Sequence, residues 1–151
     1  MKTIIMISAV LLLLCTGCNK DDSVAAAPVL TNFEYFSLDL PDSWAVLDYP
    51  VEEIGGLLSN GVDSVYYDYG PWAYAGISDL DLHLIDTLEH LTLEINNERA
   101  LILVGQRSGE DRITYNYLID KEDGFNHIRY IAYDLDDDSE IREFIMTHRF
   151  L

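Results

Sequence analysis

Basic side chains are scarce in this sequence. Lysine and arginine number 9 against 27 aspartate and glutamate residues, which gives a formal net charge of −18. A surface this acidic repels the phosphate backbone of a nucleic acid, and it also repels anionic lipid headgroups. The composition therefore argues against a nucleic-acid partner, and any attachment to a membrane must come from something other than charge.

Cysteine is nearly absent as well. The chain has two, Cys15 and Cys18, and both lie at the end of an N-terminal apolar run. A domain built from the residues after them contains no thiol. Disulfides, thiolate catalysis and cysteine-ligated zinc are thereby excluded for that domain.

Motifs of common active sites are also missing. No H-E-x-x-H pattern or other metal-ligand spacing is formed by the histidines, which are His83, His90, His127 and His148. The stretch 105–109 (GQRSG) is not a G-x-S-x-G nucleophile elbow, because its serine lies one position late. We therefore expect no catalytic residue, no cofactor and no metal, although with so many carboxylates a pair suited to glycoside hydrolysis could arise by chance.

The long apolar run that a membrane-spanning helix needs is absent too. The segment from Ile4 to Leu14 is largely apolar, but its 11 residues are too few to cross a bilayer, which takes about 20. Lys2 precedes this run, and the small residues Thr16 and Gly17 follow it. This order is typical of a secretory signal peptide.

The end of the run resembles the lipobox of bacterial lipoproteins, which are cleaved before a cysteine and acylated on it. Thr16-Gly17 stands directly before Cys18, although Cys15 occupies the −3 position, where these proteins usually have leucine. The resemblance implies a signal peptide at residues 1–17 and several acyl chains on Cys18, enough for stable attachment to a lipid bilayer. An ordinary secretory signal, cleaved without acylation, is the alternative.

The residues after Cys18 carry a second signal. Lys20, Asp21 and Asp22 resemble the export signal of surface lipoproteins in the Bacteroidota, which implies an outer-membrane protein that faces outside; an anchor that faces the periplasm is the alternative. The segment up to Asn32 shows no hydrophobic periodicity and is typical of a flexible tether. We therefore expect residues 18–32 to link the anchor to one domain at residues 33–151.

Apolar and polar residues alternate through most of that domain, which predicts antiparallel strands. The expected strands are Phe36–Leu40, Ala45–Tyr49, Ile54–Ser59, Val62–Tyr69, Leu91–Ile95, Arg99–Gln106, Ile113–Ile119 and His127–Tyr133. Asn60-Gly61 predicts a tight hairpin turn with positive φ at both residues, and Asn96-Asn97 predicts a second turn. The segment Ser78–Glu89 fits either a capped helix or a strand.

The C-terminal segment predicts a helix that packs on the sheet. Asp138 or Ser139 is a suitable N-cap. One face of the helix would carry Ile141, Phe144, Ile145 and His148. The predicted fold class is therefore α+β, an antiparallel sheet with a C-terminal helix packed on it.

Two stretches resemble the PsbP-like superfamily, which also contains a Ran-binding nuclear import factor and bacterial lipoproteins. Phe36–Trp44 (FSLDLPDSW) is similar to its opening strand and turn, and Ser139–Phe150 (SEIREFIMTHRF) is similar to its closing helix with an S/T-x-x-F element. The resemblance implies an antiparallel sheet with helices packed on it. It also implies a non-catalytic binding or assembly role.

Tyrosine is abundant between residues 66 and 74 (YYDYGPWAY). Aromatic rings beside a carboxylate can stack on sugar rings, and tyrosine and tryptophan also favour protein interfaces. Tyr69, Trp72 and Tyr74 are therefore candidate ligand contacts. Packing of the same rings in the core is the alternative.

Acidic residues gather again before the predicted helix. Asp134, Asp136 and Asp138 match positions 1, 3 and 5 of a calcium-binding loop. The match then breaks, because Ser139 and Ile145 stand where such a loop has glycine and glutamate. A strand-to-helix connection whose acids favour the helix N-terminus is the simpler interpretation.

The sequence thus predicts a non-catalytic cell-envelope lipoprotein, a binding or accessory module for an envelope protein or a glycan. Two alternatives come from other classes of protein. A compact acidic envelope protein could be an immunity-type inhibitor of a basic secreted toxin, because opposite charges speed association. The other alternative is a small envelope hydrolase.

Overall fold

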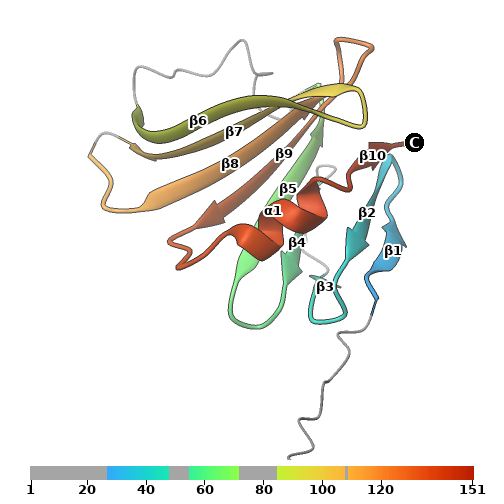
Figure 1. Cartoon of the computed structure of the whole chain (residues 1–151), viewed down its shortest axis with the longest axis horizontal. Helices are drawn as coiled ribbons and strands as arrows, with labels where there is room; N and C mark the ends of the chain where they lie inside the picture. The colour runs from blue at the N-terminus through green and yellow to red at the C-terminus, as the bar shows by residue number, and fades with distance from the viewer. Residues whose placement is uncertain (1–26, 48–54, 72–84, 108) are drawn as a thin grey trace, which may run out of the picture.

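The computed structural model describes residues 27–47, 55–71, 85–107 and 109–151 (Figure 1). Within these ranges the chain forms strands and one helix, in the order β1 (Val29–Asn32), β2 (Phe36–Leu40), β3 (Ala45–Leu47), β4 (Gly55–Ser59), β5 (Ser64–Gly70), β6 (Ile85–Ile95), β7 (Glu98–Arg107), β8 (Ile113–Asp120), β9 (His127–Tyr133), α1 (Ser139–Ile145) and β10 (Arg149–Phe150).

The strands form two antiparallel sheets. The large sheet has the order β3-β4-β5-β9-β8-β7-β6, and the small sheet has the order β1-β2-β10. Helix α1 and the small sheet lie on one side of the large sheet (Figure 1), and we call that side its inner face. The fold class is therefore α+β, as predicted, with mostly antiparallel strands and one short C-terminal helix. The second sheet was not expected.

A row of tyrosines crosses the inner face. Tyr67, Tyr130 and Tyr117 are direct neighbours on β5, β9 and β8. The ring of Phe36, from β2, meets Tyr67 and Tyr130 edge-on, at centroid distances of 5.5 and 6.2 Å. Burying such rings removes large apolar areas from water, so this contact joins the two sheets.

Trp44 packs against helix α1. Its ring is buried and meets Phe144 edge-on at 5.0 Å, and its Nε1 donates a hydrogen bond to Glu140 at 2.9 Å. The turn before it is closed by a hydrogen bond from the Trp44 amide to the carbonyl of Pro41, at 2.9 Å. The Pro-x-x-Trp stretch therefore places a large ring under α1.

The end of α1 is fastened to the small sheet through Thr147. Its hydroxyl donates to the Phe144 carbonyl at 2.6 Å and accepts a hydrogen bond from the Asp39 amide at 2.8 Å. The chain then continues as β10, where Phe150 pairs with Phe36. The helix is one turn shorter than predicted, and His148 lies beyond it, where it is nevertheless fully buried.

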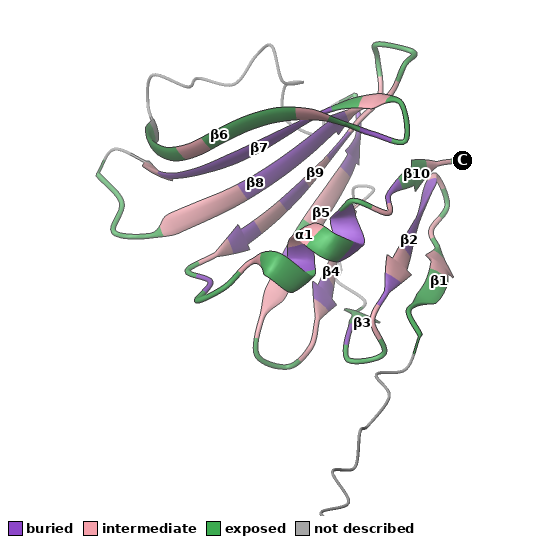
Figure 2. Ribbon diagram, viewed as in Figure 1, coloured by how far each residue is buried: buried purple, intermediate pink, exposed green. Residues whose placement is uncertain are grey.

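Strands β7 and β8 carry long runs of buried residues (Figure 2). Leu101, Leu103 and Leu118 alternate with the core residues of β7 and β8 and so point to the opposite side, the outer face, yet each is at most 1% exposed. Strands buried on both faces need continuous apolar sequence. This explains why Arg99–Gln106 is so largely apolar.

Most of the predicted strands are confirmed. Of the two predicted turns, the one at Asn96-Asn97 is confirmed and the tight turn at Asn60-Gly61 is not. Asn96 and Asn97 have φ values of 51° and 72° and form the tight turn with positive φ at both positions. At Asn60-Gly61 only Gly61 has positive φ. The Asn60 side chain instead accepts hydrogen bonds from the amides of Val62 and Asp63, which builds a wider loop. A side chain that satisfies local amides removes the need for the tighter turn.

One further expectation is corrected, and two are confirmed in part. Val29–Asn32 belongs to β1 and pairs with β2, so the predicted tether ends earlier than residue 32. The C-terminal part of Ser78–Glu89 is strand, since β6 begins at Ile85, and residues 78–84 lie outside the described ranges. Asp138 occupies the N-cap position, but its side chain makes no capping hydrogen bond.

His148 and Tyr130 form a buried polar pair in the core. The Tyr130 hydroxyl and His148 Nδ1 lie 2.8 Å apart and share a hydrogen bond. The imidazole also stacks on Phe36, at a centroid distance of 5.3 Å. Burial lowers the pKa of His148 from its ordinary 6.5 to about 3, because a charged ring would lose its hydration. The folded protein therefore holds this ring neutral.

This lowered pKa predicts a loss of stability in acid. In the unfolded chain His148 takes up a proton below about pH 6.5, whereas in the folded chain it stays neutral down to about pH 3. Unfolding is therefore favoured as the pH falls from 6.5 to 3. Between pH 7 and pH 5 the protein should lose about 2 kcal/mol of unfolding free energy relative to a His148→Gln variant. Urea titrations of both proteins would measure this, and a difference that does not change with pH would contradict it.

Candidate functional site

Tyr69, a predicted ligand contact, is a core residue. Its ring is only 8% exposed, stacks on Tyr35 at a centroid distance of 4.8 Å and lies 6.2 Å from the ring of Phe150. Burial raises the pKa of its hydroxyl. The prediction is therefore corrected at Tyr69, while Trp72 and Tyr74 lie outside the described ranges, as do Cys18, Lys20, Asp21 and Asp22.

The three aspartates of the calcium hypothesis do not converge on one point. Asp134 accepts hydrogen bonds from the Ile113 amide at 2.9 Å and from Arg112 Nε at 3.3 Å. Asp138 points instead to Tyr117 and Arg142, and Asp136 is exposed. The described residues contain no group of three or more such side chains that could hold a metal ion. The acids at positions 134–138 thus belong to the connection between β9 and α1.

Arg142 forms an ion-pair network that the sequence did not indicate. Its two terminal nitrogens donate to both oxygens of Glu89, at 2.7 and 2.6 Å, and its Nε donates to Asp138 at 2.7 Å. The same Asp138 oxygen accepts a hydrogen bond from the Tyr117 hydroxyl at 2.8 Å. The hydrogen bonds from Arg142 lower the pKa of Glu89. Helix α1 is thereby tied to β6 and β8.

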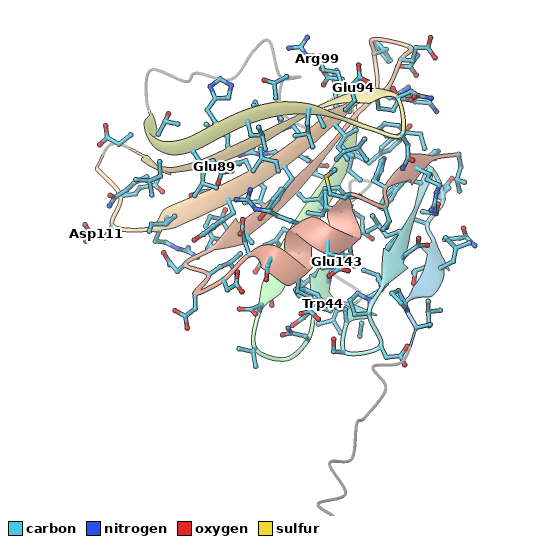
Figure 3. The ribbon with its side chains drawn as sticks, in the orientation of Figure 1. Trp44, Glu89, Glu94, Arg99, Asp111 and Glu143 are labelled. Carbon is cyan, nitrogen blue, oxygen red and sulfur yellow. The ribbon has the colours of Figure 1, made fainter. Side chains whose placement is uncertain are left out.

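A row formed by three charged side chains and a histidine crosses the outer face near the ends of the strands. Glu94 pairs with Arg99, Arg99 with Asp120, and Asp120 with His127, on neighbouring strands from β6 to β9 (Figure 3). His127 Nδ1 lies 3.0 Å from an Asp120 oxygen. Opposite charges at directly paired positions stabilise a sheet. The spacing of these residues along the chain gave no sign of the row, because it depends on the register of four strands.

A second polar cluster lies deeper in the outer face. Asn116 is buried, and its side-chain oxygen accepts hydrogen bonds from Arg129 Nη2 at 2.6 Å and Nε at 3.1 Å. Such charge-assisted bonds satisfy a buried amide that would otherwise be costly. The hydrogen bonds between Asn116 and Arg129 therefore stabilise the sheet between β8 and β9.

Strand β6 is a long edge of the large sheet. It has 11 residues, whereas the other edge strands, β1, β3 and β10, have 4, 3 and 2. Among the described residues it pairs with β7 alone. Its side chains are mostly exposed (Figure 2), and they include Leu88, 66% exposed, and Leu91, 44% exposed.

Among the described residues, the edge of β6 is the candidate contact surface. The titratable groups with short contacts, Glu89, Asp138 and His148 among them, are held by partners within the fold. The edge of β6 offers backbone groups and apolar side chains beside acidic ones, which suits an extended chain.

The described part of the chain contains no helix long and apolar enough to cross a membrane.

No protein-family model and no curated protein matches this chain. Its fold is similar to that of a solved crystal structure from Bacteroides thetaiotaomicron VPI-5482, with a TM-score of 0.57 and 13% sequence identity. The match covers 84% of this chain and 49% of that chain, so this chain spans about half the length of the protein it matches. A likeness at this identity shows the fold alone.

The Arg142 network predicts an unequal effect of two arginine substitutions. Arg142→Ala leaves the carboxylates of Glu89 and Asp138 without their partner, so the free energy of unfolding should fall by about 1–3 kcal/mol. Arg149→Ala is the matched control, because Arg149 makes a longer bond to Asp39, at 3.2 Å, in an exposed pair. That change should cost about 0–1 kcal/mol. Urea denaturation measures both, and equal losses would contradict the assignment.

Proposed function

We propose that this protein is a non-catalytic binding or accessory module, held on the outer membrane by acyl chains on Cys18 and facing outside. The observation that carries the proposal is the apolar run of 11 residues that ends in Thr16-Gly17-Cys18. Several acyl chains hold a protein stably on a bilayer, where a single chain would not. Lys20, Asp21 and Asp22, directly after this cysteine, support display on the cell surface.

The length of chain between the anchor and the domain fits this arrangement. Residues 19–28 separate Cys18 from the first residue of β1, Val29. Ten residues can span at most about 33–36 Å, which is enough to hold a domain clear of the lipid headgroups. The domain itself carries most of the 27 acidic residues, so it would be repelled by anionic headgroups rather than lie on them.

We further propose that the domain is PsbP-like. In support, Phe36–Trp44 forms β2 and a turn that buries Trp44, and Ser139–Phe150 forms α1 and β10 with Thr147 and Phe150 both in contact with the small sheet. These are the two stretches on which the resemblance depends. Because members of that superfamily mostly act as binding or assembly factors, the likeness supports a partner-binding role.

A second candidate function is supported by charge. An immunity-type inhibitor of a basic secreted toxin would use a net charge of −18 to speed association with its target. Such an inhibitor would also be an envelope protein that binds another protein. A purified domain that saturably inhibits a basic toxin of the same bacterium would distinguish this function from a structural accessory role.

The anchor is tested by replacing the acylated residue. A Cys18→Ser variant has no thiol to receive a lipid, so it should move from the membrane fraction to the soluble fraction of lysed cells. Cys15→Ser is the control and should stay in the membrane fraction. An unchanged distribution of the Cys18→Ser protein would contradict lipidation.

Surface display is tested at the residues that follow. Replacing Lys20, Asp21 and Asp22 with alanine should leave the protein in the membrane fraction but protect it from a protease added to intact cells. Two acidic residues that are exposed on the domain, Asp42 and Glu122, provide a control. A variant with alanine at both positions should be digested by the protease as fast as the parent protein. Equal digestion of the first variant and the parent would refute the export signal.

A further inference from the structure

The edge strands of this protein differ greatly in length. Proteins protect sheet edges by keeping edge strands short, and β1, β3 and β10 follow this rule with 4, 3 and 2 residues. Strand β6, with 11 residues, does not. In the described part of the chain, β6 pairs on one side only, and a long edge of this kind is a template for pairing with another chain. We propose that β6 is a docking edge that accepts an extended basic segment of a partner protein as an eighth strand of the large sheet.

The two faces of β6 define the side chains that such a partner would carry. Leu91 and Leu93 pair with Ile102 and Ala100 and so lie on the inner face, where Leu91 is still 44% exposed. A partner strand beside them would place its own inner-facing side chains over Leu91. Those side chains therefore need to be apolar, because they extend the core.

The outer face of β6 asks for a different chemistry. It carries His90, Thr92 and Glu94, all exposed, and β6 contains no lysine or arginine. Glu94 is the acid on this face, while Asp86 lies on the inner face, where it pairs with Gln106; all the charges of the strand are negative, so it repels acidic partners and attracts basic ones. The alternating pattern of a strand then specifies the occupant: apolar residues at every second position, and lysine or arginine between them.

Two features of the fold prepare β6 for this role. The register shift between Thr87 and Glu89 disrupts the N-terminal end of the edge, as bulges on edge strands do, and so confines docking to the regular part, Glu89–Ile95. The paired hydrogen bonds from Arg142 hold Glu89 in place from the side of α1. An edge that is already fixed loses less conformational entropy when it binds a partner.

A second copy of this chain is a poorer occupant. Both copies would bring the acidic residues of β6 to the same interface, and each carries a net charge of −18. Like charges at directly paired positions destabilise a sheet. The docking edge rests on the proposed function, because it names the partner class of the proposed binding module.

The test uses the full chain, purified in a neutral detergent, and a short synthetic peptide of alternating valine and lysine. The peptide should bind saturably, and hydrogen exchange should show new protection of the backbone amides of β6. Glu94→Lys and Leu91→Asn should each weaken binding by about tenfold or more. The matched controls are Asp42→Lys and Val62→Asn, which make the same chemical changes at exposed positions outside β6 and should bind as the parent does.

Several outcomes would overturn the docking edge. One is that a peptide of the same composition without alternation binds equally well. Another is that Asp42→Lys weakens binding as much as Glu94→Lys does, since attraction would then come from overall charge. Protection of β1 or β3 in place of β6, dimerisation of the protein through β6, or no saturable binding would overturn it too. None of these results changes the fractionation or digestion of the Cys18 and Lys20-Asp21-Asp22 variants, so the anchored binding module stands or falls separately.

Discussion

The aromatic ring of Phe36 is the contact on which the arrangement of the two sheets depends. It lies at the centre of a cluster of rings from both sheets and from the C-terminal segment, namely Phe33, Tyr67, Tyr69, Tyr130 and His148. Each such pair contributes about 0.5–1.5 kcal/mol beyond the burial of its apolar area. Because Phe36 is carried by β2, the cluster holds the small sheet on the inner face of the large one.

That docking decides which parts of the large sheet remain available. With the small sheet and α1 on the inner face, much of β7 and β8 is buried, and among the described residues the large sheet has its unpaired sides at its two end strands. One end is the three-residue β3, and the other is β6, which Arg142 ties to the helix through Glu89. The same packing that stabilises the core thus presents one long, acidic edge, which is the surface where we propose that a partner docks.

Several residues acquired roles that their neighbours in sequence do not indicate. Tyr69 belongs to an aromatic run that resembles a ligand platform, yet its stack with Tyr35 makes it part of the core. Asp138 precedes a helix and resembles a cap, but its carboxylate accepts hydrogen bonds from Tyr117 and Arg142. In each case a partner far away in the sequence competed successfully with the local role.

The amino-acid order alone was enough to predict most strands, the turn at Asn96-Asn97 and the C-terminal helix, because periodicity and turn chemistry act over a few residues. It also predicts a lipid anchor at Cys18 and an export signal at Lys20, Asp21 and Asp22, and both stay predictions. Only the folded chain decides that β1 joins a second sheet, that Arg142 meets Glu89 and that β6 is left as the long edge. These outcomes depend on strand register and sheet docking between residues far apart in the chain, and no local pattern encodes such distances.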